Sequence, residues 1–332
     1  MTVLVTGGTG FIGSHVAAHL VEDGRAVRLL VRDAAKVARI PALSDATSID
    51  VVVGDVTDRE SVERALDGCT AVVHAAAHVS LAEREAARAD AVNVGGTLLV
   101  VGGAAEREIP TVFVSSVSVF GVGHTRVTID TPLTERGGPY TRSKVAAERF
   151  VRELQQRGAA VSVVYPSGVL GPDVPDLGPT FQGLIGWLRT PPKTASGTSI
   201  VDVRDVALAI KHALDAPPGR WMLGGTFLTY GELRAVIGRV TGVHRWALPT
   251  PAAVLRLAGR AGDLVKRVVP FDYPLTYESM AMATQACPYD SDATCQALDL
   301  HWRPVDETLT DTIRGLAAAD QLNPRLAGTL AP

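Results

Sequence analysis

Apolar residues in the first half of the chain fall into short runs separated by amphipathic stretches. Runs rich in valine, leucine and isoleucine with little polar alternation are typical of strands covered on both faces. They lie at Val3–Val5, Val27–Val31, Ile49–Val53, Ala71–His74, Thr111–Ser115 and Val161–Tyr165. The stretches with helical spacing lie at Gly13–Glu22, Asp58–Leu66, Ala91–Glu106 and Ser143–Gln155. This alternation predicts an α/β fold with a parallel, doubly wound sheet and right-handed crossovers.

The pattern changes near Gly171. Residues 171–192 are rich in proline and glycine, which predicts a loop or short elements. A strand over Ile200–Val203 and a helix over Val206–Ala213 follow, and the later segments are mixed. We therefore expect a first domain over residues 1–172, to which residues 200–220 return. A smaller, partly interleaved lobe is expected over residues 173–332.

Composition narrows the class of protein. The 332 residues carry a formal net charge of −3, and the absence of a basic block argues against a nucleic-acid partner. Three cysteines, at positions 69, 287 and 295, form neither a disulfide framework nor a metal-ligand spacing, so no metal is expected. The N-terminus lacks a basic signal-peptide region, and no apolar run is long enough to span a membrane. These features favour a cytoplasmic protein without an integral membrane span.

The strongest local motif is Thr6-Gly7-Gly8-Thr9-Gly10-Phe11-Ile12-Gly13, which follows a strand and opens a helix. In a dinucleotide fingerprint, Gly7 would permit the tight turn and Gly10 would let backbone N–H groups approach a pyrophosphate. Gly13 would let the helix and strand pack closely, and the helix N-terminus would attract the phosphates. The alternative is a glycine-rich turn that binds no ligand. The spacing predicts a cofactor cradle with these members: Gly7, Thr9, Gly10, Phe11, Ile12 and Gly13.

Several further motifs occur in the same order as in a known family, and the chain resembles an extended short-chain dehydrogenase/reductase of the NAD-dependent epimerase/dehydratase family. The resemblance implies a Rossmann-type fold, a nicotinamide cofactor and a small-molecule substrate. A homodimer formed through the helices after strands four and five would follow the family's habit. The matching segments are residues 6–13, 54–58, 74–77, 93–97, 115–121, 140–144 and 201–206.

Cofactor choice depends on the end of the second strand. A carboxylate there binds the ribose of NAD, whereas an arginine accommodates the 2′-phosphate of NADP. The family's NAD-type aspartate aligns with Val31, and Arg32 follows with Lys36 one turn later, so we favour NADP(H). Asp33 keeps NAD(H) open as a ribose acceptor, and an exposed Arg32–Asp33 pair that binds neither is a third interpretation. The resemblance implies further cofactor contacts at Asp55, Val56, Ala75, Ala76, Ala77, Pro166 and Val169.

Tyr140 and Lys144 are four residues apart and share one face if their segment is helical. A nearby ammonium group stabilises phenolate, so we expect Lys144 to lower the pKa of Tyr140 and make it a general acid. Ser116 lies at the end of an apolar strand, where its hydroxyl could stabilise a developing alkoxide. The family's spacing before Val119-Phe120-Gly121 selects Ser116 over Ser115 and Ser118. In the family both Tyr140 and Lys144 also contact the cofactor.

On the substrate side, sugar-nucleotide members of the family carry Arg-x-x-Asn-x-x-Gly-Pro. Here Tyr165 and Gly168 occupy the arginine and asparagine positions. The chain resembles instead the branch of dihydroflavonol reductases, cinnamoyl-CoA reductases and hydroxysteroid dehydrogenases, which implies a ketone, aldehyde or alcohol on an apolar molecule. A nucleotide-sugar epimerase or dehydratase and a non-catalytic dinucleotide sensor are the alternatives. The expected substrate contacts are His78, Ser116, Tyr140 and Ser167, with Phe181, Leu184 and Trp187 as candidate pocket walls.

Residues 251–270 interleave apolar and basic side chains. One interpretation is a basic amphipathic helix on a membrane surface. The other is an ordinary helix of the lobe, with its apolar side inward and its basic side in water.

Overall fold

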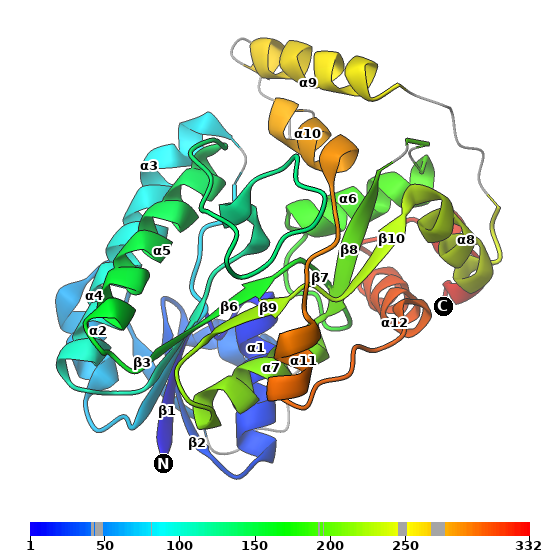
Figure 1. Ribbon diagram of the computed structural model, residues 1–332. Coiled ribbons are helices and arrows are strands. Elements are labelled where there is room, and N and C mark those ends of the chain that lie inside the picture. Colours follow the sequence, from blue (N-terminus) through cyan, green and yellow to red (C-terminus); the bar gives the residue numbers. More distant parts are fainter. Residues whose placement is uncertain are drawn as a thin grey trace.

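The computed structural model describes residues 1–40, 43, 49–80, 82–191, 193, 194, 196–244, 251–266 and 276–332 (Figure 1). Its main sheet has seven parallel strands in the order β3-β2-β1-β4-β5-β6-β9, which confirms the predicted doubly wound fold. The strands are β1 (Thr2–Thr6), β2 (Ala26–Val31), β3 (Ile49–Val53), β4 (Ala71–His74), β5 (Thr111–Val114), β6 (Val161–Pro166) and β9 (Arg220–Leu223).

Helices cover both faces of this sheet (Figure 1). On one face α1 (Phe11–Glu22) and α7 (Val203–Asp215) pack together, and Val3 and Val5 of β1 join their core. Leu4 points the other way, into the core beneath α2 (Arg59–Leu66) and α4 (Gly96–Glu106). The adjoining core beneath α5 (Pro139–Gln156) contains Phe113 and Val163. Because both faces are buried, the strands have the continuous apolar sequence seen above.

A second, three-stranded sheet belongs to the later part of the chain. It consists of β7 (Gly168–Leu170), β8 (Gly197–Asp202) and β10 (Thr226–Thr229), with β8 in the middle. Its core contains side chains from α6 (Pro179–Arg189), α8 (Tyr230–Thr241) and α12 (Val305–Ala318). Between these strands the chain returns to the main sheet through α7 and β9. The two sheets are therefore interleaved along the sequence.

Helix α6 corrects the expectation of a loop or short elements over residues 171–192. It is 11 residues long and begins with Pro179 in its first turn, a position where the missing N–H costs nothing. Phe181, Leu184 and Leu188 recur at helical spacing and are buried in the lobe core. The gain from burying this apolar face outweighs the weak helix propensity of Gly183 and Gly186.

The remaining elements are short or lie towards the C-terminus. They are η1 (Ala34–Arg39), η3 (Glu83–Glu85), α3 (Ala86–Ala89), the π-helical η4 (Asp90–Gly95), η5 (Val117–Phe120), α9 (Ala252–Lys266), α10 (Tyr277–Gln285), α11 (Asp292–Ala297), α13 (Pro324–Ala327) and η6 (Gly328–Leu330). The predicted helix over residues 91–106 thus begins with a π-helical turn that contains Asn93.

Candidate active site

The glycine turn connects β1 directly to α1. Gly7 has a φ of +72°, a left-handed conformation that other residues rarely adopt. A Cβ on Gly7 would lie 2.6 Å from the backbone nitrogen of Ala76, in the loop after β4. A Cβ on Gly13 would lie 2.2 Å from the carbonyl oxygen of Gly7. Both glycines are therefore required by close backbone packing, although Gly13 packs against the turn itself rather than against the strand.

The N-terminus of α1 is suited to bind an anion. Its cap is Gly10, which offers no side-chain oxygen to the first N–H groups, and the first turn contains no acidic residue. Thr9 and Ile12 are partly exposed on this turn, while the Phe11 ring contacts Phe181 at a centroid distance of 5.0 Å. A helix N-terminus with unpaired N–H groups and a glycine cradle fits the pyrophosphate of a dinucleotide.

The loop after β4 lies beside this turn. Ala75 and Ala76 contact the space that a Cβ on Gly7 would fill, and the Ala76 N–H donates to Thr6 Oγ1 over 3.4 Å. Ala77 is exposed, and the His78 N–H donates to Asn93 Oδ1 over 2.7 Å. The structure therefore brings Ala75 and Ala76 of this loop to the glycine turn.

The end of β2 presents two basic side chains. Arg32 and Lys36 are exposed, and within the described residues neither has an ion-pair partner. The Asp33 carboxylate caps η1 and accepts a hydrogen bond from the Ala35 N–H over 2.9 Å. Asp33 is thus used by its own helix, whereas both cations are free to meet an anion.

Asp55 and Val56 follow β3. One Asp55 oxygen accepts hydrogen bonds from the backbone N–H and the hydroxyl of Thr57, both over 2.9 Å. Val56 packs against the position of Gly96 on α4, where an added Cβ would lie 3.0 Å away. Both residues therefore shape this loop.

Ser116 and Tyr140 meet where β5 ends. Ser116 caps η5 through the Ser118 N–H, and its side chain is hydrogen-bonded to that of Tyr140. Tyr140 occupies the first turn of α5, which begins at Pro139 and is therefore longer than the predicted helix. The buried hydroxyls of Ser115 and Ser118 have no partner among the described residues, so the contact with Tyr140 distinguishes Ser116 from its neighbours.

Lys144 lies one turn further along α5 and is 2% exposed. Its Nζ donates to the Val114 carbonyl over 2.6 Å and lies 4.7 Å from the centroid of the Phe113 ring. Burial lowers the pKa of Lys144 to about 8, and the Glu148 carboxylate opposes that shift. The three predicted catalytic side chains thus converge on the carboxyl end of β5.

The protonation of Tyr140 differs from the sequence-based expectation. Burial raises the pKa of Tyr140, and the hydrogen bond with Ser116 opposes this only in part. The expected lowering by Lys144 is wrong for this arrangement, because the ammonium group is directed to the Val114 carbonyl and desolvation is the larger effect. Tyr140 is therefore a neutral phenol that holds its proton.

Asn93 connects the parts of the site. It is 1% exposed, and its Nδ2 donates to the His78 carbonyl over 3.1 Å and to Ser143 Oγ over 2.9 Å. Ser143 precedes Lys144 on α5, so this side chain joins the loop after β4 to the catalytic helix. The His78 ring is paired with Glu85 at 3.2 Å.

On the substrate side, Pro166 ends β6 and Val169 is in β7, buried to 9% exposure. The Ser167 hydroxyl between them donates to the Gly224 carbonyl over 2.8 Å, which joins the two segments that lead from the main sheet into the second sheet. Tyr165 is fully buried and donates to Glu148 Oε1 over 2.5 Å, so it belongs to the core. Of the candidate pocket walls, Phe181 and Leu184 also belong to the core.

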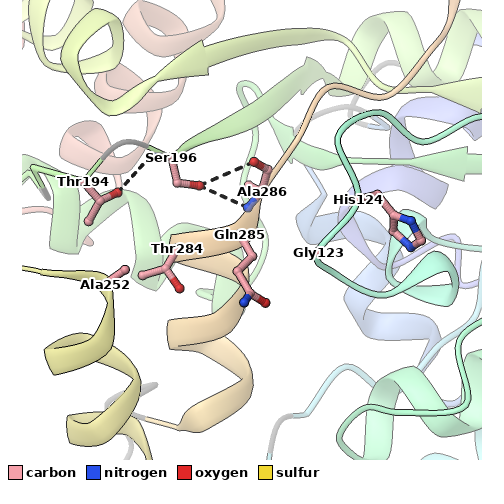
Figure 2. A pocket seen from close by; sticks show the side chains of 8 residues that line it. All are labelled: Gly123, His124, Thr194, Ser196, Ala252, Thr284, Gln285 and Ala286. Carbon is pink, nitrogen blue, oxygen red and sulfur yellow. Dashed lines mark hydrogen bonds between the residues drawn. The ribbon is translucent and has the colours of Figure 1, made fainter.

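A pocket of about 310 Å³ is lined by none of the residues predicted for the site (Figure 2). It lies between the loop after η5 and the ends of α9 and α10, and Figure 2 shows Thr284 and Gln285 across from His124. Sequence reasoning missed all of its residues, because they come from four separate segments without a shared motif. The lining consists of Gly123, His124, Thr194, Ser196, Ala252, Thr284, Gln285 and Ala286.

The sheet order and the glycine turn define the class of protein: it is an NAD(P)-dependent oxidoreductase of the extended short-chain dehydrogenase/reductase type. A family model agrees. The chain belongs to the NAD dependent epimerase/dehydratase family, whose model matches residues 3–224.

Two curated relatives cover nearly the whole chain. A putative dihydroflavonol 4-reductase from Synechocystis is 30% identical, with 93% of this chain and 92% of the relative covered. Sterol demethylase protein B from Methylococcus capsulatus is 27% identical, with 90% and 93% covered. One of these two full-length relatives is thus named as a reductase.

Solved structures share the fold. The crystal structure of gox2253 aligns with a TM-score of 0.80 and 28% identity, covering 97% of this chain and 99% of that one. UDP-glucose-4-epimerase from Stenotrophomonas maltophila, solved with NAD and formylated UDP-arabinopyranose, aligns with a TM-score of 0.77 at 20% identity, covering 97% and 99%.

Proposed function

We propose that this protein is an NADP(H)-dependent reductase of ketones or aldehydes on a largely apolar small molecule, or the corresponding alcohol dehydrogenase. The contact between Ser116 and Tyr140 at the end of β5, with Lys144 one turn away on the same helix, carries this proposal. The full-length likeness to a dihydroflavonol reductase supports the reaction class.

The residues that would hold the cofactor surround the glycine turn. The α1 N-terminus would bind the pyrophosphate, and the loop of Ala75 to Ala77 would lie alongside it. Lys144 would bind the nicotinamide ribose, with Pro166 and Val169 beside the ring. When bound, the cofactor supplies the hydride for reduction or accepts it in the reverse reaction.

The protein's own part in the reaction is proton transfer and charge stabilisation. Tyr140 donates its hydroxyl proton to the carbonyl oxygen as that oxygen becomes an alcohol, and a phenolate remains on Tyr140 until it is reprotonated. Ser116 donates a hydrogen bond to the same oxygen and stabilises its developing negative charge. The ammonium group of Lys144 becomes more favourable beside that phenolate than beside neutral Tyr140.

Arg32 and Lys36 support the choice of NADP(H). An arginine and a phosphate form a charge-assisted, bidentate contact, and both cations are unpaired within the described residues. Asp33 caps η1, so it is a weaker candidate for the ribose of NAD.

Replacement of the two hydroxyls tests the catalytic assignment. Tyr140→Phe and Ser116→Ala should each lower kcat at least ~100-fold against a panel of ketones with NADPH, because proton donation or oxyanion stabilisation is lost. The dissociation constant of NADPH should change little. Matched controls are Tyr277→Phe and Ser118→Ala, which remove the same groups outside the proposed catalytic contact. Near-normal turnover of Tyr140→Phe would overturn the assignment.

Cofactor titration tests the rest of the proposal. Arg32→Ala should raise the dissociation constant of NADPH by about 10–100-fold and leave that of NADH unchanged, since a charge-assisted hydrogen bond contributes about 1.5–3 kcal/mol. Arg314→Ala on α12 is the matched control. Tighter binding of NADH than NADPH by the wild type contradicts the NADP(H) assignment.

A cofactor that stays bound through turnover, with affinity for UDP, would point to a nucleotide-sugar epimerase or dehydratase. Binding without any turnover would point to a sensor.

A further inference from the structure

Helix α9 lies at the periphery of the molecule. In Figure 1 it is the yellow helix that lies across α10, beyond the two sheets. Its main packing partner among the described elements is α10. The two helices approach closely, because a Cβ on Gly259 would lie 2.6 Å from the carbonyl oxygen of Thr276, the residue that caps α10.

The side of α9 that faces α10 carries small and polar residues, with Gly259 and Gly262 buried. Arg256 donates to the hydroxyl of Thr284 over 3.1 Å. Asp263 accepts a hydrogen bond from the N–H of Tyr277 over 3.0 Å, and the Arg260 guanidinium lies 5.0 Å from the centroid of the Tyr277 ring. These contacts fix the rotation of α9 about its own axis.

The opposite side of α9 is apolar and faces outward. Leu257 is 65% exposed and Leu264 is 63% exposed, with Val254 and Val265 at about half exposure on the same face. Ala253 and Ala261 complete the stripe at helical spacing. An ordinary surface helix buries its apolar side, so α9 has the reverse orientation. The exposure of these four apolar side chains contradicts the expectation that the helix turns its apolar side inward, whereas Arg260 is in water as that expectation requires.

The charge around this stripe indicates what covers it. The sequence of residues 252–267 contains four basic residues and one acidic residue, whereas the whole chain has a net charge of −3; of these charged side chains, the structure describes Arg256, Arg260 and Asp263. Arg260 is exposed at the margin of the apolar stripe with its guanidinium over the Tyr277 ring, so a cation lies beside the stripe where anionic headgroups would meet it. A second copy of the chain on this face would bring two sets of like charges together, which opposes association. An anionic lipid surface complements both the stripe and the charge.

We propose that α9 docks the protein on an anionic membrane surface, with its apolar stripe inserted at the boundary between headgroups and acyl chains. The helix is roughly 22 Å long at 1.5 Å per residue, long enough to lie in that interface. The docking is peripheral, since no helix in the described part of the chain is long and apolar enough to cross a bilayer. Residues 267–270, the end of the segment singled out in the sequence, lie outside the described residues.

The position of α9 also bears on the substrate. Ala252, the first residue of α9, lines the 310 Å³ pocket together with Thr284 and Gln285 of α10 (Figure 2). A protein docked through α9 therefore holds this pocket near the lipid. Gly123 and His124 of the same pocket follow η5, the turn that Ser116 caps. Resting on the proposed function, this placement fits a carbonyl or alcohol substrate that is dissolved in the membrane.

Vesicle flotation with the full-length protein tests the docking. The wild type should bind vesicles of phosphatidylcholine with phosphatidylglycerol, bind vesicles of phosphatidylcholine alone more weakly, and dissociate as salt is added. The double substitution Leu257→Asp and Leu264→Asp should lower binding at least tenfold, because it puts carboxylates on the inserted stripe. Leu98→Asp on α4, at a residue 45% exposed, is the matched control and should bind as the wild type does.

The outcomes of these measurements separate the docking from its alternatives. Absence of binding to anionic vesicles at low salt would overturn the docking, as would an equal loss in the Leu98→Asp variant. Self-association of the wild type that disappears in the double variant would show that a second copy covers the stripe. In vesicle-free buffer, the double variant should reduce a water-soluble ketone as fast as the wild type does. Normal turnover without vesicle binding would refute the docking alone, whereas binding without turnover would refute the proposed function alone.

Discussion

His74 provides a quantitative test of how the site is held together. This last residue of β4 is 1% exposed, with Nδ1 2.7 Å from Thr6 Oγ1 and Nε2 3.1 Å from Thr97 Oγ1. Thr97 donates its own hydroxyl proton to the Asn93 carbonyl over 2.6 Å. Thr97 can therefore only accept from His74, so Nε2 carries the proton and Nδ1 accepts from Thr6. Because Thr6 also accepts from the Ala76 N–H, this chain of hydrogen bonds reaches the proposed cofactor loop.

Burial, with a smaller contribution from the charge of Lys144, lowers the pKa of His74 from 6.5 to about 3. On acidification the unfolded chain takes up this proton first, so the stability that neutral His74 provides is present above pH 6.5. It is lost progressively as the pH falls from 6.5 towards 3. Between pH 7 and pH 5 the linkage relation gives a loss of about 2 kcal/mol in the free energy of unfolding.

Urea unfolding at pH 7 and pH 5 measures this loss. His74→Gln removes the titration, so its loss of stability between the two pH values should be about 2 kcal/mol smaller than that of the wild type. His301→Gln replaces an exposed histidine and should keep the full loss. If His74→Gln and the wild type lose equal stability between pH 7 and pH 5, the account of a buried neutral imidazole is wrong.

Two further predictions concern the turn and the catalytic helix. Gly13→Ala should raise the dissociation constant of NADPH at least tenfold and lower stability by about 1–3 kcal/mol, because the new Cβ would overlap the Gly7 carbonyl. Gly183→Ala is the control, because its new Cβ would meet nothing within 4 Å, and it should leave the dissociation constant of NADPH unchanged. Equal losses of binding in the two variants would contradict the reasoning. Because the pKa of Lys144 is about 8, its ammonium group loses its proton as the pH rises through 8, and turnover should fall over the same range. Glu148→Gln should move that decline to lower pH, since the Glu148 carboxylate raises the pKa of Lys144; an unchanged or higher midpoint contradicts this coupling.

Most of the fold could be predicted from the sequence, because buried parallel strands need continuous apolar runs. The cofactor turn could also be predicted, because its requirements likewise leave a pattern in the sequence. Gly13 is required by its contact with Gly7, a few residues away, and Gly7 by the adjacent loop of Ala75 and Ala76. The spacing of the glycines along the sequence therefore predicts the turn. Ser116, Tyr140 and Lys144 were found through their positions at a strand end and on one face of a helix.

The rest of the site depends on contacts between distant segments. His124, Ser196 and Gln285 share a pocket although they are far apart in the sequence, and no periodicity connects them. Helix α6 was missed because its glycines suggest a loop, while its burial depends on partners in α8 and α12. In α9 the amphipathic pattern was visible, but only the packing of Arg256 and Asp263 against α10 shows which side faces outward.

The catalytic face of α5 explains why residue types were easier to predict than protonation. Tyr140, Lys144, Glu148 and Arg152 recur every four residues, so neighbouring charges along one face act on each other. Glu148 is fully buried and paired with Arg152, and it also accepts the hydroxyl of Tyr165, the residue that replaces the arginine of sugar-nucleotide members. Tyr165, in place of that arginine, is therefore hydrogen-bonded to the same carboxylate that raises the pKa of Lys144. A Tyr-x-x-x-Lys spacing identifies the two partners, but their pKa values depend on how deeply α5 and β6 bury this row of charges.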